Sequence, residues 1–238
     1  MRIACKALIA ATILAAAAPA WAQEVLVTAP RRGYNNDAIY GDGLVATSRP
    51  IVNLKRTADY VVQTVGVAGD TRDATIRRND LHATIRNMIA EAAKGGVELA
   101  IGDYVIEPLT LANYKSLYLR SDGRPDTDQT SFLIKVRLVP GMDIQAARDR
   151  IDRFVASVPK VGRTKASVTG LTLSVINPDQ YRGQIIDLIA ADAAMSSGKF
   201  GAGSGVDVTG LDRPVEWARG AGTEVFLFLP ASYVVRKR

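Results

Sequence analysis

Two stretches of the chain share one order of predicted elements: a β-strand, a turn that contains glycine, an amphipathic helix, a stop that contains glycine, and a second strand. The first stretch runs from Ala58 to Glu107 and the second from Ser131 to Ile176. Between segments rich in β-branched residues, the apolar residues recur with the period of a helix. This order indicates a sheet covered by helices on one face. Because the two helices differ in length, we interpret the stretches as shared topology and not as a repeat.

The predicted fold class is α/β of the α+β kind, a mixed β-sheet with helices packed on it in the order β-α-β-β-β-α-β-α-β-β. Strands are expected at 58–67, 97–107, 109–119, 131–139, 166–176, 206–217 and 223–235, and helices at 72–94, 144–158 and 178–195. In the strand 131–139, Lys135 and Arg137 alternate with apolar residues, which predicts one face in water. Pro230 lacks an amide hydrogen, so strand pairing is expected to falter just after Leu229.

The first 22 residues have the three parts of a secretory signal peptide. A basic start precedes an apolar run at 7–18, and Pro19 follows just ahead of Ala20-Trp21-Ala22, a small-x-small cleavage site. The apolar run is about a dozen residues long, shorter than the roughly 20 needed to span a bilayer. We therefore expect export, cleavage between Ala22 and Gln23, and no transmembrane helix in the mature chain.

The inventory of reactive side chains argues against an enzyme. The chain has 1 histidine and 1 cysteine, which excludes most zinc, haem and thiol chemistry. Cys5 lies in the leader, and His82 has no carboxylate fixed beside it in the sequence. The glycine-rich segment 198–205 follows a helix and precedes a strand, the reverse of a phosphate-binding loop. We expect no catalytic residue, no metal site and no cofactor.

The charge balance gives no indication of a nucleic-acid partner. The formal net charge is +6, and two of the positive charges, Arg2 and Lys6, belong to the leader. A small positive excess is no signature of nucleic-acid binding, and export from the cell argues strongly against it.

Residues 23–55 are rich in turn formers, which predicts an extended, flexible arm ahead of a folded domain at 56–238. The arm contains a β-prone run made of Glu24, Val25, Leu26, Val27, Thr28 and Ala29. This run resembles the TonB box that follows the signal peptide of outer-membrane TonB-dependent receptors. Because such boxes add a strand to a partner's sheet, the run is a candidate partner-binding arm, and the alternative is a chance match in a tail.

The last predicted strand has apolar residues on both faces. Val225, Leu227 and Leu229 point to one side, and Phe226 and Phe228 point to the other. Three helices are few for six or seven strands, so a second subunit is the expected cover for one of the two faces. We therefore predict self-association with Phe226 and Phe228 as a candidate subunit contact.

The order of elements and the segment 170–178, GLTLSVINP, resemble the SIMPL-domain family, in which a similar strand leads into a helix. Asn79, Asn87 and the helix stop Gly95-Gly96 are similar to the first strand and helix of that family, and the resemblance covers about residues 57–235. It implies a periplasmic or outer-membrane-associated protein without known catalysis. Relatives are linked to envelope or oxidative stress, and some assemble into large rings.

We therefore expect a non-catalytic structural or interaction module of the cell envelope, acting in an envelope or oxidative stress response. The alternative is a periplasmic binding module for a small apolar or peptide ligand, held on the sheet face that the helices leave bare. A large flat apolar patch would favour the first function, and a deep apolar pocket would favour the second.

Overall fold

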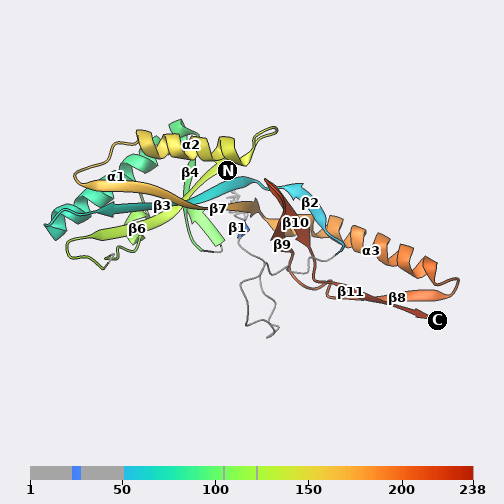
Figure 1. The fold of residues 1–238 in the computed structure, drawn as a ribbon. Helices are drawn as coiled ribbons and strands as arrows, with labels where there is room; N and C mark the ends of the chain where they lie inside the picture. Colours follow the sequence, from blue (N-terminus) through green and yellow to red (C-terminus); the bar gives the residue numbers. More distant parts are fainter. Residues whose placement is uncertain (1–22, 28–50, 104, 122, 238) are drawn as a thin grey trace, which may run out of the picture.

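The computed structural model of the protein describes residues 23–27, 51–103, 105–121 and 123–237 (Figure 1). Ala20, Ala22, Thr28 and Ala29, which belong to two of the predicted sites, lie outside these residues. The elements in chain order are β1 (Glu24–Val27), β2 (Leu54–Thr57), β3 (Tyr60–Gly69), α1 (Ala74–Gly95), β4 (Glu98–Ile101), β5 (Val105–Pro108), η1 (Tyr114–Ser116), β6 (Asp128–Arg137), α2 (Ile144–Ser157), β7 (Thr164–Ile176), η2 (Pro178–Tyr181), α3 (Arg182–Lys199), β8 (Ser204–Thr209), β9 (Glu216–Arg219), β10 (Glu224–Phe228) and β11 (Ser232–Lys237).

Helix α1 begins and ends where local sequence signals place its ends. The Asp73 carboxylate accepts a hydrogen bond from the backbone N–H of Ile76 at 2.8 Å, which caps the first turn. After Gly95, the left-handed Gly96 (φ 66°) donates its N–H to carbonyls of the last turn. A Cβ on Gly95 would lie 2.5 Å from the Phe154 ring, so this glycine also lets α2 approach α1 closely.

Six antiparallel strands pair in the closed order β1-β5-β4-β6-β3-β7. The longest pairing joins β3 to β6, from Tyr60 opposite Arg137 to Gly69 opposite Asp128. Strand β1 lies between β5 and β7 and pairs with both. Its four residues therefore complete the barrel.

The two faces of the barrel strands belong to two apolar clusters, because successive side chains point to opposite sides. Val61 and Val65 of β3 join the large core that contains Leu81 of α1 and Ile151 of α2. The opposite face lines the inside of the barrel, where the buried apolar residues are Leu26, Tyr60, Val62, Ala100 and Ile106. The sheet face expected to be bare is thus the filled interior of a barrel.

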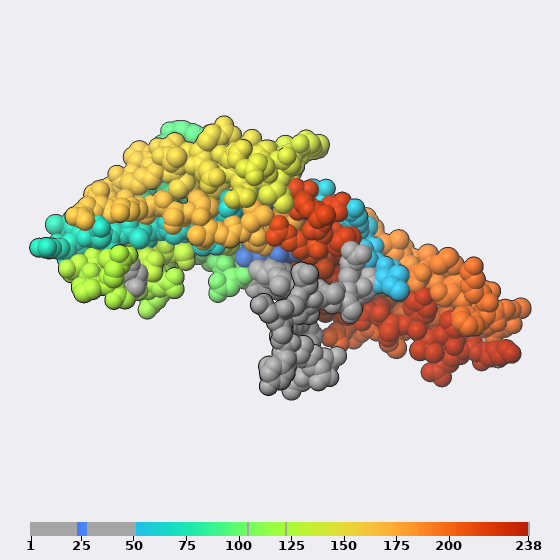
Figure 2. Space-filling model, in the orientation of Figure 1, coloured from blue at the N-terminus to red at the C-terminus, as the bar shows by residue number. Residues whose placement is uncertain are grey.

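The C-terminal part of the chain extends away from the barrel (Figures 1 and 2). The sheet β2-β10-β9 adjoins the barrel, and Val225 and Leu227 of β10 are fully buried in the large core. Beyond this sheet, α3 runs beside the two-stranded sheet of β8 and β11, and we call these three elements the C-terminal arm. Among the described helices, none is both long and apolar enough to cross a bilayer.

The predicted α+β class is confirmed, with antiparallel sheets and three α-helices. The interruption near Pro230 is also confirmed, since β10 ends at Phe228 and β11 begins at Ser232. The strand predicted at 109–119 is wrong. Asn113 accepts a hydrogen bond from the Thr110 N–H at 2.7 Å and donates one to the Pro108 carbonyl at 2.9 Å, which holds this segment in a turn that leads into η1.

The flexible arm predicted at 23–55 is wrong for Glu24–Val27, which form the buried strand β1. Val25, Leu26 and Val27 are at most 4% exposed. Residues 28–50 lie outside the described residues, and β2 occupies the end of the predicted arm. The many turn formers in 28–55 give the whole predicted arm the composition of a loop. The four residues of β1 itself are either apolar or, in the case of Glu24, held in an ion pair.

Candidate functional site

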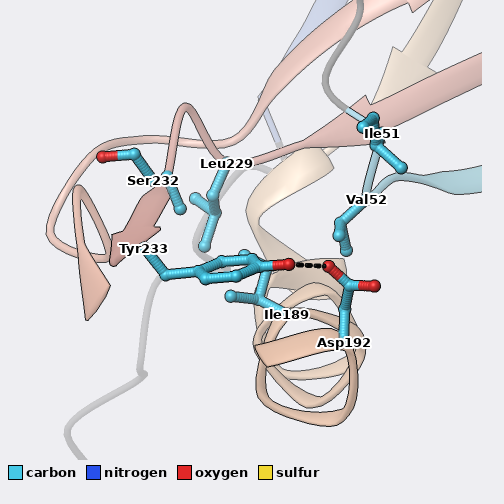
Figure 3. A pocket seen from close by; sticks show the side chains of 8 residues that line it. Ile51, Val52, Ile189, Asp192, Leu229, Ser232 and Tyr233 are labelled. Carbon is cyan, nitrogen blue, oxygen red and sulfur yellow. Dashed lines mark hydrogen bonds between the residues drawn. The ribbon is translucent and has the colours of Figure 1, made fainter. Parts of the chain in front are cut away.

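A pocket lies where the C-terminal arm joins the rest of the molecule (Figure 3). Its volume is about 270 Å³. The lining residues come from the chain ahead of β2, from α3 and from the segment around β11: Ile51, Val52, Ile189, Asp192, Leu229, Ala231, Ser232 and Tyr233. Most of these side chains are aliphatic, so the walls favour an apolar group.

The polar groups of the pocket form a short hydrogen-bonded chain. The Tyr233 hydroxyl donates to Asp192 Oδ2 at 2.6 Å, as Figure 3 shows. Ser196 Oγ lies 2.9 Å from the same hydroxyl oxygen and donates to it, because the single tyrosine proton is directed at the carboxylate. Ile189, Asp192 and Ser196 are three and four residues apart on α3, which brings them to one helix face.

The polar groups of the pocket suit the binding of a hydrogen-bond donor. Asp192 makes no ion pair with any of the residues that the structure describes, so its carboxylate has acceptor capacity left for a donor on a ligand. The hydroxyl of Tyr233 has no base beside it other than this carboxylate. Within the described ranges, no three metal-ligating side chains gather in any one place.

A second group of titratable side chains lies inside the barrel. The Lys135 ammonium is hydrogen-bonded to the Glu24 carboxylate and lies 3.2 Å from Glu98 Oε2. Ser174 donates to the other oxygen of Glu24. The side chains of Lys135 and Glu24 are 8% and 10% exposed, whereas that of Glu98 is 51% exposed. These contacts tie β1 to β6 and β7, which is a structural role.

Tyr60 completes this inner group. Its hydroxyl donates to Glu98 at 3.0 Å and accepts from Arg137 at 3.0 Å, and the Lys135 ammonium lies 4.1 Å from its ring centre. Burial, followed by the negative charge of Glu98, raises the pKa of Tyr60 to about 12. The phenol therefore stays protonated at neutral pH and serves as a hydrogen-bond donor.

The prediction that Lys135 faces water is wrong. The strand alternates as expected, with Ile134 and Val136 fully buried on the opposite face. Lys135 is nevertheless only 7% exposed, because β1 closes the barrel over it. Alternation within one strand shows which residues share a face, but it does not show whether that face is later enclosed.

The predicted partner-binding arm is divided by the structure. Thr28 and Ala29 lie outside the described residues, whereas Glu24–Val27 all pair with β7, and Glu24 and Val25 also pair with β5. One edge of the strand is fully paired and the other is paired over its first half, which leaves little of it to add to a partner's sheet. In this fold the four residues act as a barrel strand.

The predicted subunit contact is wrong for Phe228, which is 7% exposed in the single chain. Phe226 is half-buried, and its ring would lie 2.9 Å from a Cβ on Gly220. Strand β10 is the central strand of β2-β10-β9, so both of its edges are paired within the chain. The alternation of the strand was predicted correctly, since Val225, Leu227 and Leu229 share the fully buried face.

The pocket was missed by the sequence analysis. Asp192 and Tyr233 are 41 residues apart, and each belongs to a segment with an ordinary amphipathic pattern. The local signal on α3 is a carboxylate three residues after Ile189 on the face that packs inward. That signal marks a boundary residue and does not show what lies opposite.

Comparisons with known proteins leave the family of this chain open. No family model matches it, and no curated protein matches it. A crystal structure of an uncharacterized conserved protein from Listeria innocua aligns over 76% of this chain and 92% of its own, with 14% sequence identity and a TM-score of 0.15. A TM-score of this size does not establish a common fold.

Proposed function

We propose that the protein is an exported, non-catalytic interaction module of the cell envelope, in the periplasm or at the outer membrane, and a member of the SIMPL-domain family with a role in envelope or oxidative stress. The leader pattern, the segment 170–178 and the sparse reactive side chains support this proposal. One structural observation carries the interaction role, and it lies on the C-terminal arm.

The outer face of α3 is apolar and almost uncharged. Leu188 and Met195 are 41% and 61% exposed, and they lie seven residues apart on one helix face. From Gly183 to Gly198 the helix contains no lysine or arginine. A helix that faces water on one side ordinarily carries charges there, so this face favours contact with another protein.

A second copy of the chain is the partner that best fits this face. The face has alanines beside Leu188 and Met195, and small residues allow two helices to approach closely. From Gly183 to Gly198 the one exposed charge is Asp187, and Lys199 is exposed at the very end of the helix, so a matching surface must also be nearly uncharged. The same face on another copy meets that requirement, which is how isologous dimers form.

The double variant Leu188→Lys/Met195→Lys is expected to be a folded monomer, and the wild-type mature chain is expected to be an oligomer. Light scattering at high micromolar concentration measures both states, and circular dichroism checks the fold. The matched control is Val139→Lys/Ile76→Lys, because these residues are similarly exposed but lie away from the arm. A wild-type monomer, or equal loss of assembly in the control, would contradict the proposal.

The pocket favours a second candidate function, a periplasmic binding module for a peptide. Its volume of about 270 Å³ is below the roughly 300–1,000 Å³ of typical ligand pockets. It therefore suits one aliphatic side chain that carries a donor for Asp192, and a terminal ammonium is such a donor.

Hexylammonium is the probe for this second function. We expect its addition at millimolar concentration to shift the amide resonances of Asp192 and Tyr233 in a proton–nitrogen NMR spectrum. Ala231→Phe should abolish the shifts by filling the pocket, whereas Asp192→Asn should weaken them and leave the walls intact. Hexanol is the neutral control, and equal shifts with hexanol would show that the carboxylate takes no part.

A further inference from the structure

A positively charged surface lies on α1, far along the chain from the arm. Arg78, His82 and Arg86 are four residues apart in succession, which places them on one helix face. Lys115 of η1 lies beside this face, because the ring of its neighbour Tyr114 meets the His82 ring edge-on at 5.6 Å. We call Arg78, His82, Arg86, Leu111, Lys115 and Tyr118 the basic face.

The three permanent cations of the basic face have no partners. Among the described residues, none forms an ion pair or a hydrogen bond with the side chain of Arg78, Arg86 or Lys115. Some arginines elsewhere are paired, such as Arg77, which donates to Asp128 at 2.7 Å. The side chains of Arg78, Arg86 and Lys115 are instead available to an anionic partner.

The electrostatic environment of His82 shows that these cations act together. Burial lowers the pKa of His82, and the positive charges of Lys115, Arg78 and Arg86 lower it further. No acidic side chain counters them on this helix face, since Asp80 and Glu91 lie on the opposite side of α1 at helical spacing.

Two large apolar side chains are exposed in the segment that carries Lys115. Leu111 is 60% exposed and Tyr118 is 80% exposed, and in the chain they lie on either side of η1. Tyr114 between them is 7% exposed and its ring meets the His82 ring, which fixes the segment to α1. The segment thus brings one cation, one exposed aliphatic side chain and one exposed aromatic side chain to the neighbourhood of the helix.

We propose that the basic face binds the surface of an anionic lipid bilayer. Arginine and lysine near a membrane surface are attracted to anionic headgroups, and tyrosine is enriched at the level of those headgroups. Leu111 supplies an aliphatic group for the boundary with the acyl chains. A partner for these cations must also cover the exposed Leu111 and Tyr118, and the interface of an anionic bilayer offers both charged headgroups and acyl chains.

Vesicle co-sedimentation of the mature chain tests this proposal. We expect binding to vesicles of phosphatidylglycerol and phosphatidylcholine in equal amounts, and none to phosphatidylcholine alone. Arg78→Gln/Arg86→Gln should weaken binding by about fivefold for each cation removed. Leu111→Ser/Tyr118→Ser, which keeps every cation, should also weaken binding to the anionic vesicles at low salt.

The control is Arg148→Gln/Arg153→Gln, which removes the same charge from exposed positions on α2. An equal loss of binding in this control would overturn the proposal, because it would show a response to net charge alone. Binding to polyglutamate but not to vesicles would also overturn it, in favour of an acidic protein partner. Neither outcome bears on the assembly of the C-terminal arm, which uses other residues.

Discussion

A chain that begins at Thr28 is expected to lose most or all of the folding stability of a chain that begins at Gln23. The missing residues form β1, in which Val25, Leu26 and Val27 are at most 4% exposed. Burial of each such side chain contributes about 1.5–3 kcal/mol. Three of them contribute roughly 5–9 kcal/mol, as an upper estimate, against a total stability of about 5–15 kcal/mol for a typical protein.

Urea unfolding, followed by circular dichroism, measures this loss. The matched control is Gln23→Ala, because it shortens an exposed side chain and keeps the Gln23 carbonyl that accepts from the Asn177 N–H at 2.7 Å. The control should unfold at the wild-type urea concentration. If the chain that begins at Thr28 did so too, β1 would not be part of the folded barrel in solution, and the segment would be the free arm that its composition predicts.

Lys135→Met is expected to destabilise the protein by about 3–5 kcal/mol, because it leaves the buried Glu24 carboxylate without its cation. Glu24→Leu should cost less. In that variant Lys135 keeps Glu98 at 3.2 Å and the Tyr60 ring at 4.1 Å, and Glu98 is open to solvent. The double variant Glu24→Leu/Lys135→Met removes both charges and should be more stable than Lys135→Met alone.

The free energies of unfolding of the four proteins form a double-mutant cycle. Lys94→Met is the control, since it breaks the exposed pair with Glu91, and such pairs contribute about 0–1 kcal/mol. A double variant less stable than Lys135→Met would contradict a stabilising interaction between Glu24 and Lys135, because the losses from the two single substitutions would then simply add. Lys135→Met at wild-type stability would show that water reaches the barrel interior.

The parts of the fold that were predicted correctly depend on short-range signals. Helix α1 was placed well because its apolar period and its stop at Gly95-Gly96 lie within one segment, although its cap is Asp73 and the helix begins at Ala74, two residues after the predicted start. The end of pairing near Pro230 has a similarly local cause, the missing amide hydrogen. In each case the residues that decide the structure are neighbours in the chain.

The parts that were missed depend on partners far along the chain. Glu24 contacts Lys135, which is 111 residues away in the chain, and Ser174, which is 150 residues away. No local sequence pattern predicts either contact. The pocket has the same character, since Tyr233 and Asp192 meet only after the chain has turned back along α3. Composition and resemblance suggest a class of function, but they do not show which surface performs it. The outer face of α3 and the basic face are recognised only when the exposure of each side chain is known.

The position of β1 has a consequence for the order of events during synthesis. Ribosomes release a chain from its N-terminus, so β1 emerges before the strands on either side of it, β5 and β7. Its pairing with β7 is complete only when Ile176 has followed, opposite Glu24. Until then the three aliphatic side chains of β1 remain exposed, which makes the unfinished chain prone to aggregation.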